Sequence, residues 1–147
     1  MKIIYRKVLA LLLGMLGVSS CVMKVMYGTP YADYNISGKV KQPSGAPIVG
    51  AKVVIGQVSD TGTYNSGLSV FDTLSTDRDG RYVFNRDEWP ATHLRIIAMD
   101  TDGDLNGGTF KRDSIDITDI QFEGKSGSWY SGKLTLTDVD ITLKKEE

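Results

Sequence analysis

The chain has few of the side chains that enzymes most often use for catalysis, since its 147 residues include one cysteine and one histidine. The cysteine is Cys21, so no disulfide can form within the chain. The histidine is His93, and no zinc-ligand spacing, P-loop or dinucleotide fingerprint accompanies it. A nucleophile elbow of the form G-x-S-x-G is also absent. These absences favour a protein without catalytic activity, and a hydrolase using His93 is the alternative.

The chain also lacks an apolar segment long enough to span a bilayer. Its longest apolar run, Val8–Val18, would reach about 16 Å as a helix, whereas a spanning helix must cross about 30 Å. An excess of basic residues is missing too, with 17 Lys and Arg against 18 Asp and Glu. Proteins that bind nucleic acid or anionic lipid need basic clusters, so neither class of partner is expected.

The first residues resemble the signal segment of a bacterial lipoprotein. Met1–Lys7 carries three basic residues and no acid, and the apolar run after it has the length of a signal-peptide core. The run ends in Val18-Ser19-Ser20-Cys21, which resembles the bacterial lipobox. That resemblance implies cleavage before Cys21 and fatty acylation, such as palmitate, which would anchor the chain in a membrane. The expected division is a signal peptide over 1–20, a lipidated leader over 21–32 and a β-sandwich domain over 33–147.

Apolar and polar residues alternate from Tyr34 to Lys41, which is typical of a half-buried β-strand. Six further segments combine apolar residues with flanking turn signals, and the mature chain shows no sustained helical periodicity. The expected strands are 34–41, 51–59, 68–77, 81–85, 93–99, 109–122 and 133–144. About seven short strands separated by turns predict an all-β, antiparallel sandwich. In the third strand, we expect Val70 and Phe71 to lie in the core.

Two of these segments change the side of the strand on which their apolar residues fall. In the sixth segment the change follows Ile117, which predicts a bulge or a bend near Thr118-Asp119. In the seventh segment the change falls between Leu136 and Val139. An irregularity is therefore expected in both segments.

Two motifs in the first half of the mature chain resemble those of the carboxypeptidase regulatory-like domain. The first has the form G-x-V, a short turn, then P-I/L-x-G-A-x-V, and the second has the form T-x-x-x-G-x-F/Y-x-F. The matching residues are Gly38, Val40, Pro47, Ile48, Gly50, Ala51, Val53, Thr76, Gly80, Tyr82 and Phe84. The resemblance covers roughly residues 34–100. It implies a transthyretin-like or Ig-like sandwich and no particular activity.

A narrower resemblance extends over nearly the whole chain. The lipobox, the segment "YGTPYADYNISGKV", the sandwich motifs and the segment "DTDGDLNGG" follow each other as in small lipoproteins of the Bacteroidota type. Some of these lipoproteins are encoded with a radical S-adenosylmethionine (radical SAM) protein, so the resemblance implies a possible radical SAM partner. Because Cys21 is the only cysteine, a second, thiol-based modification site is not available.

The segment "DTDGDLNGG", residues 100–108, is a candidate calcium-binding loop. Calcium takes six to eight oxygen ligands, and oxygen-bearing side chains occupy alternate positions of this segment. The candidate ligands are Asp100, Asp102, Asp104 and Asn106. An EF-hand would need Gly at position 6 and Glu at position 12, where this chain has Leu105 and Lys111. The two interpretations left open are a calcium site of another kind and a solvated loop between strands.

Aromatic residues near predicted loops suggest a second kind of site. Trp129 and Tyr130 lie near the end of the loop over 123–132, and Trp89 lies in the connector after the fourth strand. Such rings can stack on sugars, which would make the protein a carbohydrate-binding or calcium-stabilised adhesion module. Packing in the core, or at its rim, is the other interpretation.

These features together favour a non-catalytic protein that is lipid-anchored in the bacterial cell envelope and has a binding or assembly role. Its expected partners are the membrane, through Cys21, and an envelope protein or glycan. The segment Val22–Met26 contains no acid, which favours the outer membrane with the domain facing the periplasm.

Overall fold

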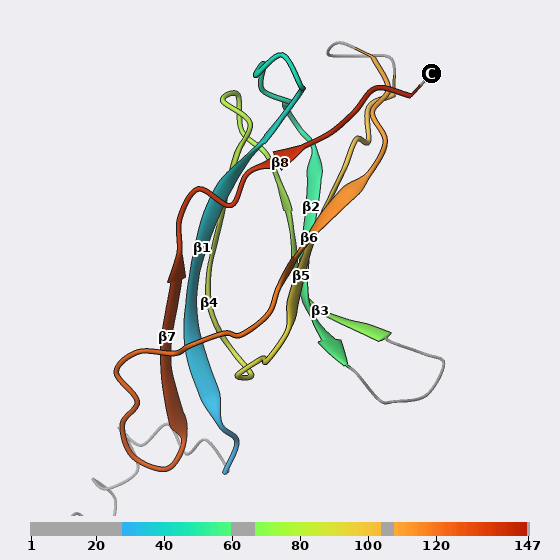
Figure 1. Ribbon diagram of the computed structural model, residues 1–147. Helices are drawn as coiled ribbons and strands as arrows, with labels where there is room; N and C mark the ends of the chain where they lie inside the picture. Colours follow the sequence, from blue (N-terminus) through green and yellow to red (C-terminus); the bar gives the residue numbers. More distant parts are fainter. Residues whose placement is uncertain (1–27, 60–66, 104–107, 147) are drawn as a thin grey trace, which may run out of the picture.

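The computed structural model describes residues 28–59, 67–103 and 108–146 as a sandwich of two β-sheets (Figure 1). No helix occurs among these residues, so they include none that could cross a membrane. The all-β class predicted from the sequence is confirmed, with eight strands rather than about seven. The strands are β1 (Tyr31–Lys41), β2 (Lys52–Ser59), β3 (Gly67–Ser75), β4 (Arg81–Glu88), β5 (Leu94–Met99), β6 (Asp113–Ile117), β7 (Tyr130–Leu136) and β8 (Ile141–Thr142).

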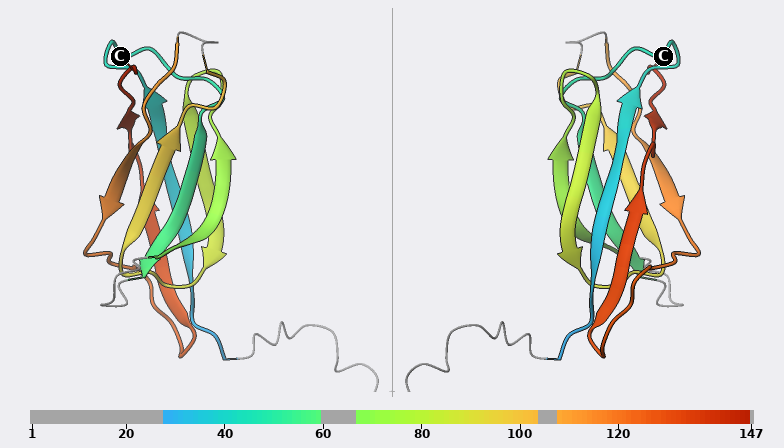
Figure 2. Two further views of the ribbon diagram at one scale, coloured as in Figure 1. Left: turned by 90° about the vertical axis from the view of Figure 1, so that its right-hand side faces the viewer. Right: turned by 90° about the vertical axis from the view of Figure 1, so that its left-hand side faces the viewer.

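Each sheet has four strands, and the two sheets face each other along most of their length (Figure 2). One sheet has the order β4-β1-β7, with β8 also paired to β1, and the other has the order β3-β2-β5-β6. All pairs of the second sheet are antiparallel, as is β1–β4. β7 and β8, however, pair with β1 in parallel. The first sheet is therefore not purely antiparallel. After β6 the chain crosses from the second sheet to the first, and such a crossover allows β7 and β8 to run parallel to β1.

The core lies between the facing surfaces of the two sheets. Along β1, every second residue from Ala32 to Val40 is buried, as the alternation in the sequence predicts. Ile55 in β2 and Ile96 in β5 are fully buried opposite them. Burial of one such side chain contributes about 1.5–3 kcal/mol, so the alternation determines which face of each strand turns inward.

One core prediction is wrong, since the side chain of Val70 is exposed whereas Phe71 packs against the core. The cause is a bulge, because the register between β2 and β3 shifts between Ile55 and Gly56. A Cβ at Gly56 would overlap the carbonyl oxygen of Ser69, so the bulge requires glycine there. The extra residue changes the parity of β3, and Phe71 turns inward in place of Val70.

The irregularity predicted near Thr118-Asp119 is confirmed by a break directly after β6. Asp119 has a φ of 56°, a left-handed conformation that ends the extended strand. Beyond the break, Ile120 and Phe122 still pack against the core, although neither belongs to a strand. The bend therefore returns these side chains to the interior.

The irregularity predicted between Leu136 and Val139 is also confirmed. Leu136 pairs with Ile36 and Ile141 pairs with Val40, so the β7–β8 segment carries one residue more than β1 over the same length. The backbone takes up this extra residue near Asp138, which has a φ of 59°. One extra residue turns the following side chains to the other face, which brings the side chain of Ile141 into the core.

The β7–β8 segment passes directly over Gly38 of β1. A Cβ at Gly38 would overlap the carbonyl oxygen of Val139, so only glycine fits. Tyr82, the cross-strand partner of Gly38, donates its hydroxyl hydrogen to this carbonyl at 2.6 Å. Burial raises the pKa of Tyr82, so its hydroxyl remains a donor at neutral pH. The N–H of Val139 donates to the carbonyl of Ser37 at 3.0 Å, which completes the crossing.

Thr76, a buried polar residue, joins the loop before β2 to the end of β3. Its hydroxyl donates to the carbonyl of Ile48 at 2.7 Å and accepts from the N–H of Ala51 at 2.9 Å. Two backbone groups of a buried turn are thereby satisfied, as buried polar groups generally are. This contact gives a physical reason for a threonine at the start of the second sequence motif.

Gly38→Ala is expected to lower the free energy of unfolding by about 2–3 kcal/mol, because the added methyl group forces the crossing segment away from β1. The matched control is Gly67→Ala, where the methyl group meets no atom and φ is not positive, so a change within about 0.5 kcal/mol is expected. Urea unfolding followed by tryptophan fluorescence measures both. Equal stability of the two variants would contradict the close packing at Gly38.

Candidate functional site

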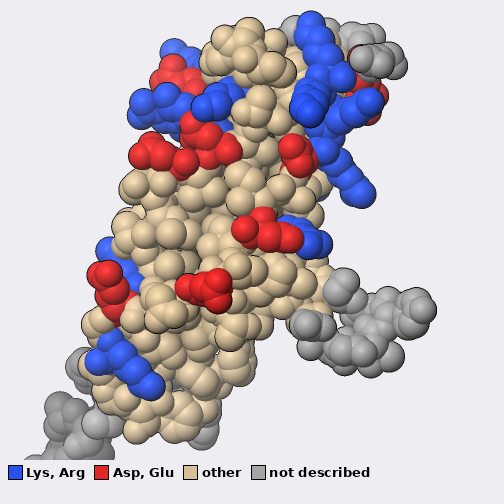
Figure 3. Space-filling model, in the orientation of Figure 1, with Lys and Arg blue, Asp and Glu red and all other residues tan. Residues whose placement is uncertain are grey.

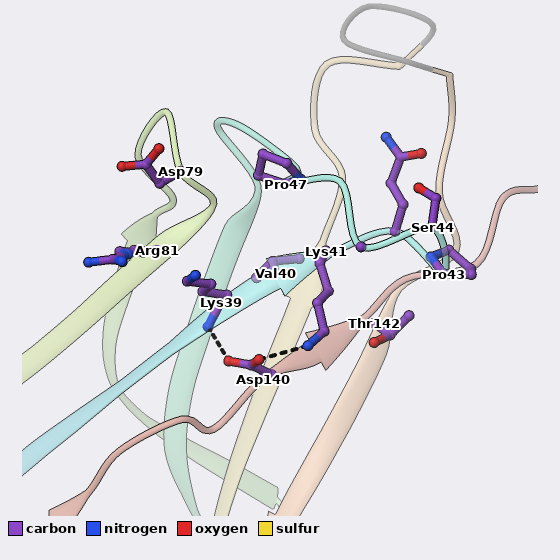
Figure 4. A pocket seen from close by; sticks show the side chains of 12 residues that line it. Lys39, Val40, Lys41, Pro43, Ser44, Pro47, Asp79, Arg81, Asp140 and Thr142 are labelled. Atoms are coloured by element: carbon purple, nitrogen blue, oxygen red, sulfur yellow. Dashed lines mark hydrogen bonds and ion pairs between the residues drawn. The ribbon is translucent and has the colours of Figure 1, made fainter.

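A polar groove of about 700 Å³ opens at the end of the sandwich where β1 finishes (Figure 4). Its walls come from β1, β4, β8 and the turn over residues 42–47. Its main charged and polar lining residues are Lys39, Lys41, Asp79, Arg81, Asp140 and Thr142. We refer to it as the distal groove, because the chain enters the sandwich at the opposite end, at Tyr31. Lysine and arginine side chains gather around this end of the molecule, with acidic side chains among them (Figure 3).

Asp140 lines the distal groove and accepts hydrogen bonds from two residues of β1. Its Oδ1 accepts a hydrogen bond from the backbone N–H of Lys39 at 2.9 Å, and its Oδ2 accepts one from Nζ of Lys41 at 2.8 Å. The hydrogen bond from Lys41 holds the pKa of Asp140 below its usual range, and the backbone donor of Lys39 acts in the same direction. Asp140 is therefore ionised at neutral pH, and Lys41 is its ion-pair partner.

Lys39 and Arg81 are cations of the same groove that form no ion pair among the described residues, although the charge of Lys39 also helps to lower the pKa of Asp140. They are cross-strand partners in the β1–β4 ladder, so two positive side chains stand directly opposite each other. Neither the Nζ of Lys39 nor the guanidinium of Arg81 forms a hydrogen bond or ion pair with the described residues. Like charges in this position destabilise a sheet. A carboxylate or phosphate between them would offset the repulsion and accept charge-assisted hydrogen bonds from both.

A second hollow, of about 340 Å³, adjoins the distal groove. Lys39, Arg81 and Asp140 line both spaces, so they form the ridge between them. The second hollow is also lined by Gly38 and Tyr82, and so it lies beside the crossing described above. A ligand whose anionic group binds at the ridge could therefore extend the rest of its structure into either hollow.

The sequence did not identify this groove. Alternation places Lys39 on the outer face of the first strand, but it does not reveal that Arg81 is the residue opposite. Asp140 is separated from Lys41 by 99 positions, and the parallel pairing that joins them has no local sequence signal. The one sequence signal near the groove is the irregularity predicted between Leu136 and Val139, because it marks the point where the chain leaves a regular strand shortly before Asp140.

The candidate calcium loop is only partly described. Asp104 and Asn106 lie outside the described residues. The carboxylate of Asp100 accepts hydrogen bonds from the N–H of Phe110 at 3.1 Å and of Asp102 at 3.3 Å, which closes the base of the loop. Within the described ranges, no group of three or more His, Cys, Asp or Glu side chains is placed to hold a metal ion. A calcium site at 100–108 stays a prediction.

His93 lies just before β5 and close to one carboxylate. Its Nε2 is 3.7 Å from Oδ1 of Asp116, and this buried nitrogen has no hydrogen-bond partner among the described residues. Arg95 donates to both oxygens of Asp116, at 2.6 and 2.7 Å, and these bonds lower the pKa of that carboxyl. In the part of the chain that the structure describes, no hydrogen bond joins His93 to a serine. The hydrolase alternative gains no support from this geometry.

Trp129 and Tyr130 lie at the end of the sandwich where β1 begins, and their surroundings differ. The side chain of Trp129 is exposed. Tyr130 is half-buried, donates its hydroxyl hydrogen to Asp33 at 2.8 Å and packs on Tyr31 with ring centroids 5.2 Å apart. A carbohydrate-stacking site formed by the pair stays a prediction. Cys21, the expected lipidation site, lies outside the described residues.

Comparisons with known proteins give no family assignment. No family model matches the chain, and no curated protein matches it. Among solved structures, the chain is similar to catechol 1,2-dioxygenase from Pseudomonas arvilla C-1, with a TM-score of 0.47 and 17% identity over 82% of this chain and 55% of that one. A mutant catechol 1,2-dioxygenase from Acinetobacter radioresistens gives a TM-score of 0.44 and 15% identity, over 82% of this chain and 53% of that one. The chain spans about half the length of these enzymes, and a likeness at this level carries no argument about activity.

Asp140→Asn is expected to lower the free energy of unfolding at pH 7 by about 0.5–1 kcal/mol, because the variant keeps its shape but loses the charge that faces Lys41. A carboxyl with a lowered folded-state pKa stabilises the fold above its unfolded pKa, about 3.9, and this contribution disappears as pH falls through the folded-state pKa. The difference between variant and parent should therefore vanish in acid. The control is Asp79→Asn, because the carboxylate of Asp79 has no ion-pair partner among the described residues. Urea unfolding at pH 7 and at lower pH values compares the parent protein with the two variants. A pH-independent deficit in Asp140→Asn would contradict this account.

Proposed function

We propose that the protein is a non-catalytic, lipid-anchored component of the bacterial cell envelope that holds another envelope component in its distal groove. The anchor would be the acylated Cys21, with the domain facing the periplasm from the outer membrane. The resemblance of Val18-Ser19-Ser20-Cys21 to a lipobox supports the anchor. A radical SAM protein is one candidate partner, because of the resemblance to lipoproteins encoded beside such proteins.

The observation that carries the binding role is the cross-strand pair of cations, Lys39 and Arg81, which form no ion pair among the described residues and line an open groove. The groove also lies far from the expected anchor. Eight residue steps of β1 separate Tyr31 from Lys39, the first residue of that strand to line the groove, and they span roughly 26 Å at about 3.3 Å per residue. A groove in this position would point away from the membrane and toward a partner.

The chemistry of the groove favours a partner that presents carboxylates. Lys39 and Arg81 supply donors of different shape, a compact ammonium and a planar guanidinium, which together suit a carboxylate cluster on a protein surface. The groove is open and largely polar, and the ion pair of Lys41 with Asp140 leaves the side chains of Lys39 and Arg81 without an ion-pair partner among the described residues. We therefore propose an acidic segment of an envelope protein as the ligand.

The anchor is tested with Cys21→Ala, which is expected to abolish incorporation of labelled palmitate and to release the protein from the membrane fraction, because no other residue provides a thiol. Ser20→Ala is the matched control, since it keeps a small residue before the cysteine and should retain both label and membrane association. Unchanged membrane association of Cys21→Ala would contradict the proposed anchor.

The groove is tested with the double variant Lys39→Gln and Arg81→Gln, using fluorescently labelled poly-L-glutamate as the probe. Loss of two charge-assisted contacts is expected to weaken binding at low salt by at least about tenfold in fluorescence anisotropy titrations. The control is Lys125→Gln with Lys133→Gln, which removes the same charge near the start of β1, at the opposite end of the molecule. Equal weakening by the two double variants would show a non-specific charge effect and would reject the groove as the site.

A further inference from the structure

Two exposed tryptophans flank the point where the chain enters the sandwich. Trp89 follows Glu88, the residue of β4 that pairs with Ala32, and its side chain is 56% exposed. Trp129 precedes Tyr130, which pairs with the first residue of β1 from the other side, and its side chain is 49% exposed. Two large apolar rings thus remain in contact with solvent at one end of the domain, beside the same strand.

The backbone at both tryptophans is firmly held. The carbonyl of Trp129 accepts a hydrogen bond from the N–H of Tyr31 at 2.8 Å, and its ring lies against Gly28, where a Cβ would come within 3.1 Å of the ring. The carbonyl of Trp89 accepts from the buried hydroxyl of Tyr34 at 2.7 Å, and that hydroxyl accepts from the N–H of Ala91 at 2.8 Å. Burial raises the pKa of Tyr34 to about 12, so this donor persists at neutral pH. The fold therefore holds fixed the backbone that carries both rings.

The length of chain before β1 limits what these rings can contact. Seven residue steps separate Cys21 from Gly28, and even a fully extended chain covers at most about 25 Å over that distance. With Cys21 acylated, the end of the sandwich that carries Trp89 and Trp129 would therefore always stay close to the bilayer. The distal groove lies at the other end, so the tryptophan end is the one that can reach the membrane.

The chemistry of this end fits the interfacial region of a bilayer. Tryptophan is enriched at membrane–water interfaces, where the ring contacts acyl chains and the indole N–H contacts water and headgroups. Asp33, Asp87 and Glu88 lie on strands beside the two tryptophans, and Lys125 and Lys133 lie at the same end, so acidic and basic residues are mixed there without the excess of basic residues that anionic lipids attract. The surface therefore suits zwitterionic headgroups.

We propose that Trp89 and Trp129 form a membrane-contact surface that inserts at the headgroup level of a zwitterionic leaflet and sets the orientation of the domain on the bilayer. This proposal rests on the acyl anchor at Cys21. The anchor supplies attachment, whereas the two rings limit tilting of the domain and keep the distal groove directed away from the lipid.

The experiment uses the full protein, purified from membranes and reconstituted in phosphatidylcholine vesicles whose lipids carry a quencher near the headgroup. The chain has two tryptophans, so Trp89→Phe and Trp129→Phe each leave one native reporter. The control reporter is Val49→Trp in a chain that also carries both phenylalanine substitutions, since Val49 lies in the turn region at the distal end and is partly exposed. The quenched fraction of each native tryptophan should be at least about twofold that of the control, as expected for rings at the interface.

Flotation of the same vesicles separates the two proposals. Protein that floats with the vesicles while both native tryptophans are quenched no more than the Val49→Trp reporter would overturn the contact surface and leave the anchor intact. Protein that does not float would remove the anchor, and the contact surface with it.

Discussion

The hydrogen bond from the hydroxyl of Tyr82 to the carbonyl of Val139, made over the bare α-carbon of Gly38, is the contact on which the rest of the structure depends. A fully buried carbonyl without a donor would cost about 1–3 kcal/mol, and the carbonyl of Val139 is part-buried, so the donor from Tyr82 offsets part of such a cost. Because this carbonyl has a donor, the β7–β8 segment can turn inward, take up its extra residue and continue along β1. The side chains of Ile141 and Leu143 reach the core only through this change of register.

The same crossing produces the candidate site. Beyond it, the chain brings Asp140 against the backbone of Lys39 and the ammonium of Lys41, and among the described residues this carboxylate forms its ion pair with Lys41. Lys39 and Arg81 then remain opposite each other in the β1–β4 ladder. The crossing over Gly38 therefore stabilises the fold and also determines which side chains line the groove. A substitution at the crossing would change both the stability of the protein and the structure of the groove.

Much of the fold could be predicted from local patterns, whereas the groove could not. The alternation from Tyr34 to Val40 identified the buried face because burial of apolar area is the largest favourable term, and it acts on each strand separately. Val70 was misplaced because the bulge opposite Gly56 depends on a partner strand, and partner strands are not visible in a local pattern. The parallel pairing of β7 and β8 with β1 has the same property, so the contacts of Asp140 could not be inferred.

The two proposed surfaces make the long strand β1 the link between them. Its first residues lie between Trp89 and Trp129, and its last residues form one wall of the distal groove. Partner strands pair with it along both edges, so it cannot bend independently of the sheet. A rigid strand transmits orientation: if the tryptophan end is fixed at the bilayer, the direction of Lys39 is fixed as well. An acyl anchor alone would limit the distance of the domain from the bilayer but not its orientation. Contact of both tryptophan rings with the lipid, beside the same strand, would remove most of that orientational freedom.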